Sequence, residues 1–248
     1  MTAHTEAYVL VHGAHHGAWV WDPLVPHLGL PAVAVDLPGR GAPTDLRSLT
    51  ISGCAEAVVK QMRLAGLRRV TLVGHSLAGS VAWTVAAMAP EMVVGLVGIA
   101  AVFPLAGKRA TDLWPTGLRW LPRARLAVRR GGPNEPLTLT DRNAARRLAN
   151  DMDEDQTAWL LERLGPETAG FSTSRVPQLQ LAPELRRGYV LCRQDMALSA
   201  GRQRAQADHI RSPIVELPTG HDPMVSAPQA LARVLDDLTA GWSNDRPR

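Results

Sequence analysis

The sequence contains little cysteine and almost no lysine. Its 248 residues include two cysteines, Cys54 and Cys192, which are too few to crosslink a domain of this length. A disulfide scaffold is therefore excluded, and the cysteine and histidine spacing of a zinc finger is absent as well. Disorder is also excluded, because 46% of the residues are hydrophobic and only 20% are charged. The chain is long enough for one large α/β domain or two small ones.

The sequence also lacks an uninterrupted hydrophobic run and a basic leader. The longest uncharged stretch, the 21 residues from Val70 to Pro90, contains Gly74 and Gly79, which divide it into a strand, a turn and a helix. We therefore expect no membrane span. Because no basic segment precedes an apolar one at the N-terminus, no secretion signal is visible and we expect a cytoplasmic protein.

The net charge of +4 is carried mainly by arginine, since Lys60 and Lys108 are the only lysines. The excess is concentrated between residues 108 and 130, which hold seven basic residues and one acidic residue. This segment is either a solvated face or a docking site for an anionic partner, such as an acidic carrier protein or a coenzyme A thioester. No recognition motif accompanies the charge, so nucleic acid is not an expected partner.

Short β-branched runs alternate with helical patterns along most of the chain. Strands are predicted at 8–12, 32–36, 70–74, 93–101, 188–192 and 213–217, and helices at 49–65, 77–88, 200–210 and 227–238. The strands are apolar on both faces, as buried parallel strands are. The pattern predicts an α/β fold with a doubly wound, mostly parallel sheet of about six strands.

One interval breaks this alternation. Residues 104–187 contain no convincing strand and eight prolines, with helical patterns at 141–150 and 154–164. An all-helical insertion after a sheet strand is typical of a lid. We therefore predict a core domain of residues 1–103 and 188–248, with residues 104–187 as an inserted helical lid.

The segment Val-Gly-His-Ser-Leu-Ala-Gly at 73–79 lies where a predicted strand meets a predicted helix. This position and these small residues are typical of a nucleophile elbow, in which a sharp turn exposes Ser76 at the carboxyl end of the sheet. The fifth position of the motif is Ala78 rather than glycine, which adds only one methyl group. The alternative is that Ser76 merely caps the helix.

A serine nucleophile needs a base and an orienting carboxylate. His221 follows the last predicted strand by a short loop, where the base belongs in the chain order serine, acid, histidine. Asp195 follows the preceding strand and is the predicted acid. Asp222 is the rival, but a residue next to His221 is poorly placed to reach its neighbour's ring. The backbone N–H groups of Leu77 and Ala14 are the predicted oxyanion donors.

The chain resembles the α/β-hydrolase superfamily in three segments. These are Val-Leu-Val-His-Gly-Ala-His-His-Gly-Ala-Trp-Val-Trp at 9–21, the elbow at 73–79, and Tyr-Val-Leu-Cys-Arg-Gln-Asp at 189–195. Within it, the similarity is to the plant methylesterase and hydroxynitrile lyase branch. The resemblance implies the α/β-hydrolase fold, Ser76, Asp195 and His221 as catalytic triad, and no cofactor or metal. Cyanide-releasing members carry a threonine and a lysine where this chain has Gly13 and Asp222, so the resemblance favours an esterase over a lyase.

Candidate substrate contacts are less firmly indicated. His15 and His16 could line the pocket mouth or be loop histidines bonded to backbone. The candidate set is Gly13, His15, His16, His75, Trp159 and Asp222.

We therefore expect a serine hydrolase that cleaves a carboxylic ester, lactone or thioester of a small apolar molecule through an acyl-enzyme on Ser76. Two alternatives stay open at this point: a non-hydrolytic biosynthetic enzyme that uses the triad for elimination, cyclisation or lyase chemistry, and a hydrolase-like ligand receptor. A homodimer is compatible with the sequence.

Overall fold

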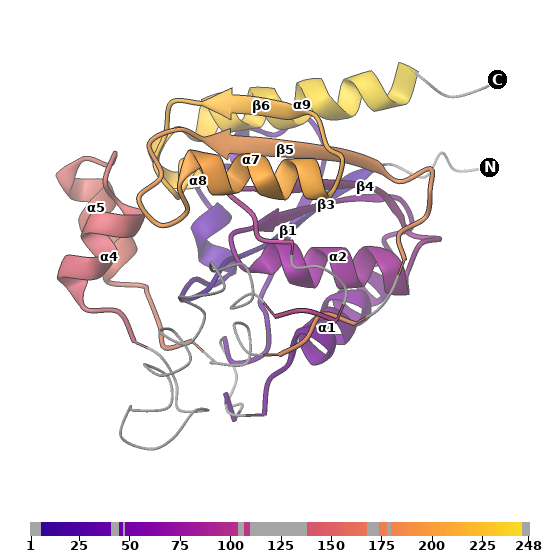
Figure 1. Ribbon diagram of the computed structural model, residues 1–248, viewed down its shortest axis with the longest axis horizontal. Coiled ribbons are helices and arrows are strands. Elements are labelled where there is room, and N and C mark those ends of the chain that lie inside the picture. The colour runs from indigo at the N-terminus through magenta and orange to yellow at the C-terminus, as the bar shows by residue number, and fades with distance from the viewer. Residues whose placement is uncertain are drawn as a thin grey trace.

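Six parallel strands form a single sheet in the order β2-β1-β3-β4-β5-β6 (Figure 1). The computed structural model describes residues 6–40, 45–46, 48–103, 107–109, 138–167, 174–177 and 180–244. The strands are β1 (Ala7–Val11), β2 (Ala32–Val35), β3 (Val70–His75), β4 (Val93–Ile99), β5 (Arg186–Cys192) and β6 (Ile214–Leu217). Each lies within two residues of its predicted bounds, and the predicted doubly wound α/β fold is confirmed.

Helices cover both faces of this sheet. One face carries α1 (Ile51–Leu64), α2 (Ala78–Met88) and α7 (Ala200–His209). The other carries the short helices η1 (Ala18–Trp21), η2 (Val25–His27) and α8 (Pro223–Ser226) together with α9 (Pro228–Asn244). Helix α9 continues beyond its predicted end at residue 238, and Trp242 near its end packs on Gly95 of β4, where a β-carbon would collide with the indole.

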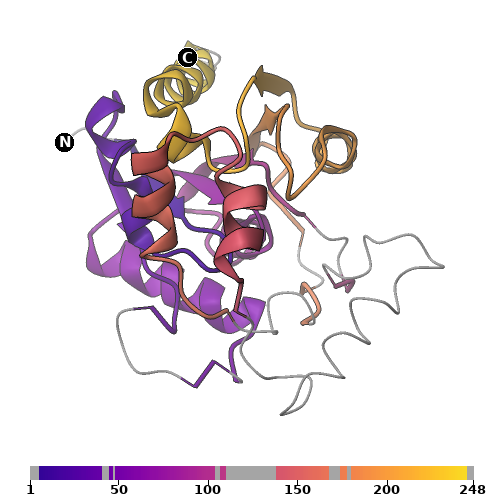
Figure 2. The same ribbon diagram turned by 90° about the vertical axis from the view of Figure 1, so that its left-hand side faces the viewer.

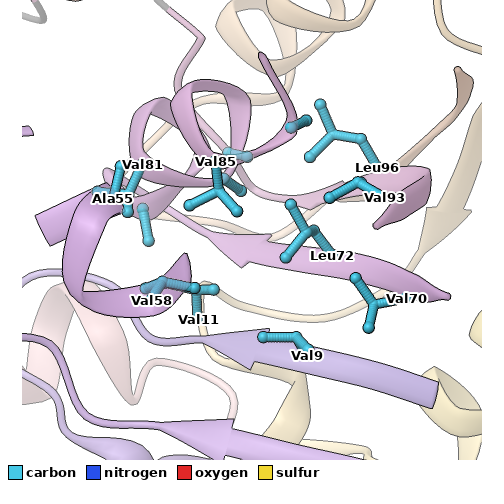
Figure 3. Packing of buried hydrophobic residues seen from close by; sticks show 14 of the residues in the cluster. Val9, Val11, Ala55, Val58, Val70, Leu72, Val81, Val85, Val93 and Leu96 are labelled. Carbon is cyan, nitrogen blue, oxygen red and sulfur yellow. The ribbon is translucent and has the colours of Figure 1, made fainter. Parts of the chain in front are cut away.

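The two cores follow from the alternation of side chains along each strand. Val9 and Val11 of β1 face α1 and α2, whereas Tyr8 and Leu10 face α9 and η1. Figure 3 shows the first of these clusters, in which valines of the strands meet valines and alanines of the two helices. Because both faces are buried, the strands are apolar throughout, which is why their sequence pattern is continuous.

Helices α4 (Asp141–Leu148) and α5 (Glu154–Leu161) lie beyond the carboxyl ends of the strands (Figure 2). Helix α5 begins with a capping box, in which the Asp153 carboxylate accepts from the Gln156 N–H and the Gln156 side chain accepts from the Asp153 N–H. The Asp151 carboxylate accepts from the Gly220 N–H at 2.6 Å, and the Gln156 side-chain amide donates to the Val225 carbonyl at 3.0 Å. These contacts hold both helices against the loop that follows β6.

None of the helices that the structure describes combines the length and hydrophobicity needed to cross a bilayer. The basic segment 108–130 lies outside the described residues except for Lys108 and Arg109.

Candidate active site

Ser76 occupies the turn between β3 and α2 and has a backbone φ of +53°. A serine in this left-handed region is strained, and the strain is held by surrounding contacts. The Ser76 N–H donates to the Ile99 carbonyl at 3.0 Å, and its carbonyl accepts from the Val102 N–H at 2.9 Å. The turn is thereby fixed to the end of β4, as a nucleophile elbow requires.

Two glycines allow the strand and helix to approach closely enough for this turn. A β-carbon on Gly74 would lie 3.0 Å from the Ala78 carbonyl oxygen and from the Ala82 β-carbon. A β-carbon on Gly79 would lie 2.7 Å from the Val102 carbonyl oxygen. Gly79 thus leaves no room for a side chain and Gly74 leaves very little, whereas Ala78 is accommodated with its side chain buried.

His221 and Asp195 form a buried hydrogen-bonded pair in the loops that follow β6 and β5. His221 Nδ1 lies 2.7 Å from Asp195 Oδ2. The other carboxylate oxygen of Asp195 accepts from the N–H groups of Ala197 and Leu198 at 2.6 and 2.8 Å. Because an ionised carboxylate only accepts, His221 Nδ1 carries the proton and Nε2 is left as the basic nitrogen.

The electrostatic surroundings favour proton uptake at His221. Burial alone would lower the pKa of His221, but the charge of Asp195 and its hydrogen bond outweigh burial and raise this pKa above its usual value of 6.5. The side chain amide of Gln203 donates to Asp195 Oδ2 at 3.1 Å and keeps that oxygen oriented. Gln203 is a supporting residue that the sequence pattern did not reveal.

The loop after β1 packs against the turn that carries Ser76. A β-carbon on Gly13 would lie 3.0 Å from the Ser76 β-carbon and 2.8 Å from His75 Nδ1, so only glycine fits there. Neither the Ala14 N–H nor the Leu77 N–H forms a hydrogen bond with another residue that the structure describes. Both remain predictions as oxyanion donors.

His16, His75 and Asp222 form a second buried cluster beside the His221–Asp195 pair. Their donor atoms lie within 4.8 Å of one another, and two imidazoles with a carboxylate are a set that zinc accepts. His75 fits a metal poorly, because its Nε2 lies 3.0 Å from the His221 carbonyl and must carry a proton to donate there. Metal binding would move that proton to Nδ1, which has no partner among the described residues.

His15 is held by the described end of the predicted lid. Its backbone φ is +69°, its N–H donates to a Glu167 carboxylate oxygen at 3.0 Å, and its Nδ1 lies 3.0 Å from the Gly165 carbonyl. Arg40 pairs with the same Glu167 oxygen at 2.6 Å and also bonds to the His16 carbonyl. The loop that carries Ala14 is therefore joined to residues 165–167 by partly buried polar contacts.

The structure thus gives the candidate substrate contacts partners within the protein. Gly13, His16, His75 and Asp222 are buried, and His15 is partly buried. Trp159 of α5 packs edge-on against Trp19 with ring centroids 5.2 Å apart. Contact with substrate stays a prediction for all six. Cys192 is buried, and burial raises the pKa of its thiol, consistent with an inert core residue.

A strained serine between β3 and α2, with an Asp–His pair at the ends of β5 and β6, is typical of the class of α/β hydrolases. The model of the "Alpha/beta hydrolase family" matches residues 8–234, and the chain belongs to this family. The predicted resemblance is thereby confirmed.

Relatives of this chain include plant enzymes and a plant binding protein. It is 26% identical over 251 residues to norfluorocurarine synthase 2 of a Strychnos species, covering 94% of both chains. It is 27% identical over 254 residues to salicylic acid-binding protein 2 of Nicotiana tabacum, covering 93% of this chain and 96% of that protein. The crystal structure of polyneuridine aldehyde esterase has a TM-score of 0.79 at 20% identity, covering 95% of this chain and 99% of that chain.

Proposed function

We propose that the protein hydrolyses a carboxylic ester, lactone or thioester of a small apolar molecule. The proposal is supported by a strained Ser76 at the turn after β3 and by a buried His221–Asp195 pair in the loops after β6 and β5. The rings of His75 and His221 have centroids 4.7 Å apart, so the residue next to Ser76 already touches the proposed base. Catalytic hydrogen bonds from serine to histidine often tighten only when substrate is bound.

In the proposed reaction, Ser76 Oγ attacks the acyl carbon while His221 Nε2 takes its proton. Asp195 keeps the His221 tautomer fixed and stabilises the imidazolium that forms. The oxyanion is held by the N–H groups of Ala14 and Leu77. His221 then protonates the leaving alcohol or thiol, and water, deprotonated by His221, releases the acid from Ser76.

The proposal also includes the predicted lid and the basic segment within it. The predicted lid of residues 104–187 extends two residues into β5, because Arg186 and Arg187 pair with β4. Residues 104–185 act as a lid inserted in the core, and the contacts of Asp151, Gln156 and Glu167 with the core support this division. The basic segment 108–130 would face solvent or an anionic carrier or coenzyme A moiety of the substrate.

Turnover of a short-chain p-nitrophenyl ester tests the proposal. Wild-type protein should release p-nitrophenol, whereas Ser76→Ala should retain its fold, measured by circular dichroism, and lose turnover by at least about 10³-fold. The matched control is Ser80→Ala in the next turn of α2, whose hydroxyl donates to the Val102 carbonyl at 3.1 Å. Equal activity of the wild type and Ser76→Ala would refute the nucleophile assignment.

A second candidate function is favoured by the relatives named norfluorocurarine synthase, which suggest that this scaffold also serves biosynthetic reactions. In that case the triad would drive a reaction without net addition of water. Turnover in H₂¹⁸O separates the two: hydrolysis incorporates ¹⁸O into the acid product, and its absence would favour the second candidate.

A further inference from the structure

Asp222 is a fully buried carboxylate that the proposed triad does not use. It follows His221 directly in the chain, yet its side chain contacts histidines from two distant segments. Its Oδ2 lies 3.1 Å from His16 Nε2, and its Oδ1 lies 3.2 Å from His75 Nε2. Burying a charge is costly unless it is paired, so the protonation states of these histidine partners determine how Asp222 is stabilised.

The hydrogen bonds of His16 determine where its protons lie. His16 Nδ1 is 2.8 Å from the Ala14 carbonyl, which can only accept, so Nδ1 carries a proton. His16 Nε2 faces the Asp222 carboxylate. Burial favours the neutral acid, but His16, His75 and His221 outweigh burial and hold the pKa of Asp222 below its usual range. An ionised Asp222 also only accepts, so both nitrogens of His16 are protonated.

His75, in contrast to His16, carries a proton on only one ring nitrogen. Its Nε2 donates to the His221 carbonyl at 3.0 Å, with Asp222 Oδ1 close to the same nitrogen. Its Nδ1 has no hydrogen-bond partner within the described residues, and burial holds the pKa of His75 well below 6.5. His75 is therefore neutral with its proton on Nε2, and the negative charge of Asp222 favours this tautomer.

These contacts join the three segments that build the proposed active site. His16 closes the turn that carries Ala14, His75 precedes the nucleophile Ser76, and Asp222 adjoins the base. We infer that Asp222 is a positioning residue, which ties the oxyanion loop to the His221 loop through its hydrogen bond to His16 and lies against His75 of the nucleophile turn, where its Oδ1 forms no hydrogen bond with a described residue. This inference rests on the proposed function for its catalytic consequence, but its proton arrangement can be measured without catalysis.

Two substitutions separate the positioning effect of the Asp222 side chain from the effect of its negative charge. In Asp222→Asn, the amide can donate to a singly protonated His16 Nε2, so the tie is kept while His16 loses one proton. In Asp222→Ala, both contacts are lost. We expect Asp222→Ala to lower kcat about 10- to 100-fold with KM changed less than about threefold, because small misplacements of catalytic groups have costs of this size. We expect Asp222→Asn to stay within about fivefold of the wild type.

Ser226→Ala is the matched control, because Ser226 ends the short helix that follows Asp222 and its buried hydroxyl has no partner among the described residues. Asp222→Ala within twofold of this control would overturn the inference, and so would equal losses in Asp222→Ala and Asp222→Asn. Failure of the wild type to turn over esters or to react with a fluorophosphonate would instead refute the proposed function.

Nitrogen-15 NMR of the histidine rings at pH 7 supplies a readout that a purely structural role would not move. We expect both ring nitrogens of His16, assigned by the loss of their signals in His16→Gln, to be protonated in the wild type, and Nε2 to lose its proton in Asp222→Asn. A neutral His16 in the wild type would overturn the inference, and so would a stoichiometric metal ion retained by the purified wild-type protein.

Discussion

Replacing Asp195 by asparagine should prevent His221 from acting as the base without disturbing the fold of the site. The carboxylate of Asp195 only accepts hydrogen bonds: Oδ1 receives two backbone N–H groups at 2.6 and 2.8 Å, and Oδ2 receives His221 Nδ1 at 2.7 Å and the Gln203 amide at 3.1 Å. An asparagine oxygen would take the place of Oδ1, because two fixed N–H groups require an acceptor there. Its NH₂ group would then face His221 Nδ1.

This arrangement forces His221 Nδ1 to accept a hydrogen bond, so the proton moves to Nε2 and the ring can no longer deprotonate Ser76. The same change of tautomer in the serine protease triad lowers kcat about 10⁴-fold, and we expect a loss of 10³- to 10⁴-fold here. The NH₂ group also faces the Gln203 amide, which leaves a donor unpaired and lowers the free energy of unfolding by about 1–3 kcal/mol.

The assay is hydrolysis of p-nitrophenyl acetate by Asp195→Asn and, as matched control, Asp222→Asn, with unfolding by urea measured for both. The pH profile of the wild type adds an independent check. Since His221 must be neutral to act as base and its pKa is raised, kcat/KM should fall as pH drops through a value above 6.5. A loss below tenfold in Asp195→Asn, or a larger loss in Asp222→Asn, would refute the reasoning.

Three further predictions concern stability. Gly79→Ala should lower the free energy of unfolding by about 1–3 kcal/mol in urea titrations and reduce ester turnover, because its methyl group meets the Val102 carbonyl at 2.7 Å; unchanged stability would contradict this packing. Glu167→Gln should lower the free energy of unfolding by about 3 kcal/mol, because Arg40 is then a largely buried cation without its carboxylate. A change below about 0.5 kcal/mol would show that the Arg40–Glu167 pair contributes little to stability. Burial lowers the pKa of His12 to about 3, so below pH 6.5 the folded state binds fewer protons than the unfolded state. The free energy of unfolding should therefore fall as pH drops below 6.5, by up to about 1.4 kcal/mol per pH unit. His12→Gln should flatten that dependence, and an identical slope would exclude His12 as its source.

Much of the core of this site could be predicted from local sequence. The strands are readable because both faces are buried, and the elbow is readable because small residues fit the close approach of strand and helix at Gly74 and Gly79. The Asp195 and His221 positions follow from the order of strands in the chain. Each of these signals lies within a few neighbouring residues.

The supporting contacts could not be predicted, because they join residues that are distant in the chain. The sequence argument that Asp222 is poorly placed to reach the His221 ring concerned only neighbours, whereas Asp222 bonds to His16, 206 positions away. The Arg40–Glu167 pair spans 127 positions and joins two loops whose relative placement no periodicity encodes. Such pairs depend on how the loops assemble at the carboxyl edge of the sheet.

The central claim is that Ser76 is a nucleophile activated by His221. It is tested most directly by treating the protein with a fluorophosphonate and locating the adduct by peptide mass spectrometry. The account predicts stoichiometric modification of the wild type at Ser76, no adduct in Ser76→Ala, and labelling at least about 10²-fold slower in His221→Ala. An unmodified Ser76, or an adduct on another residue, would contradict it.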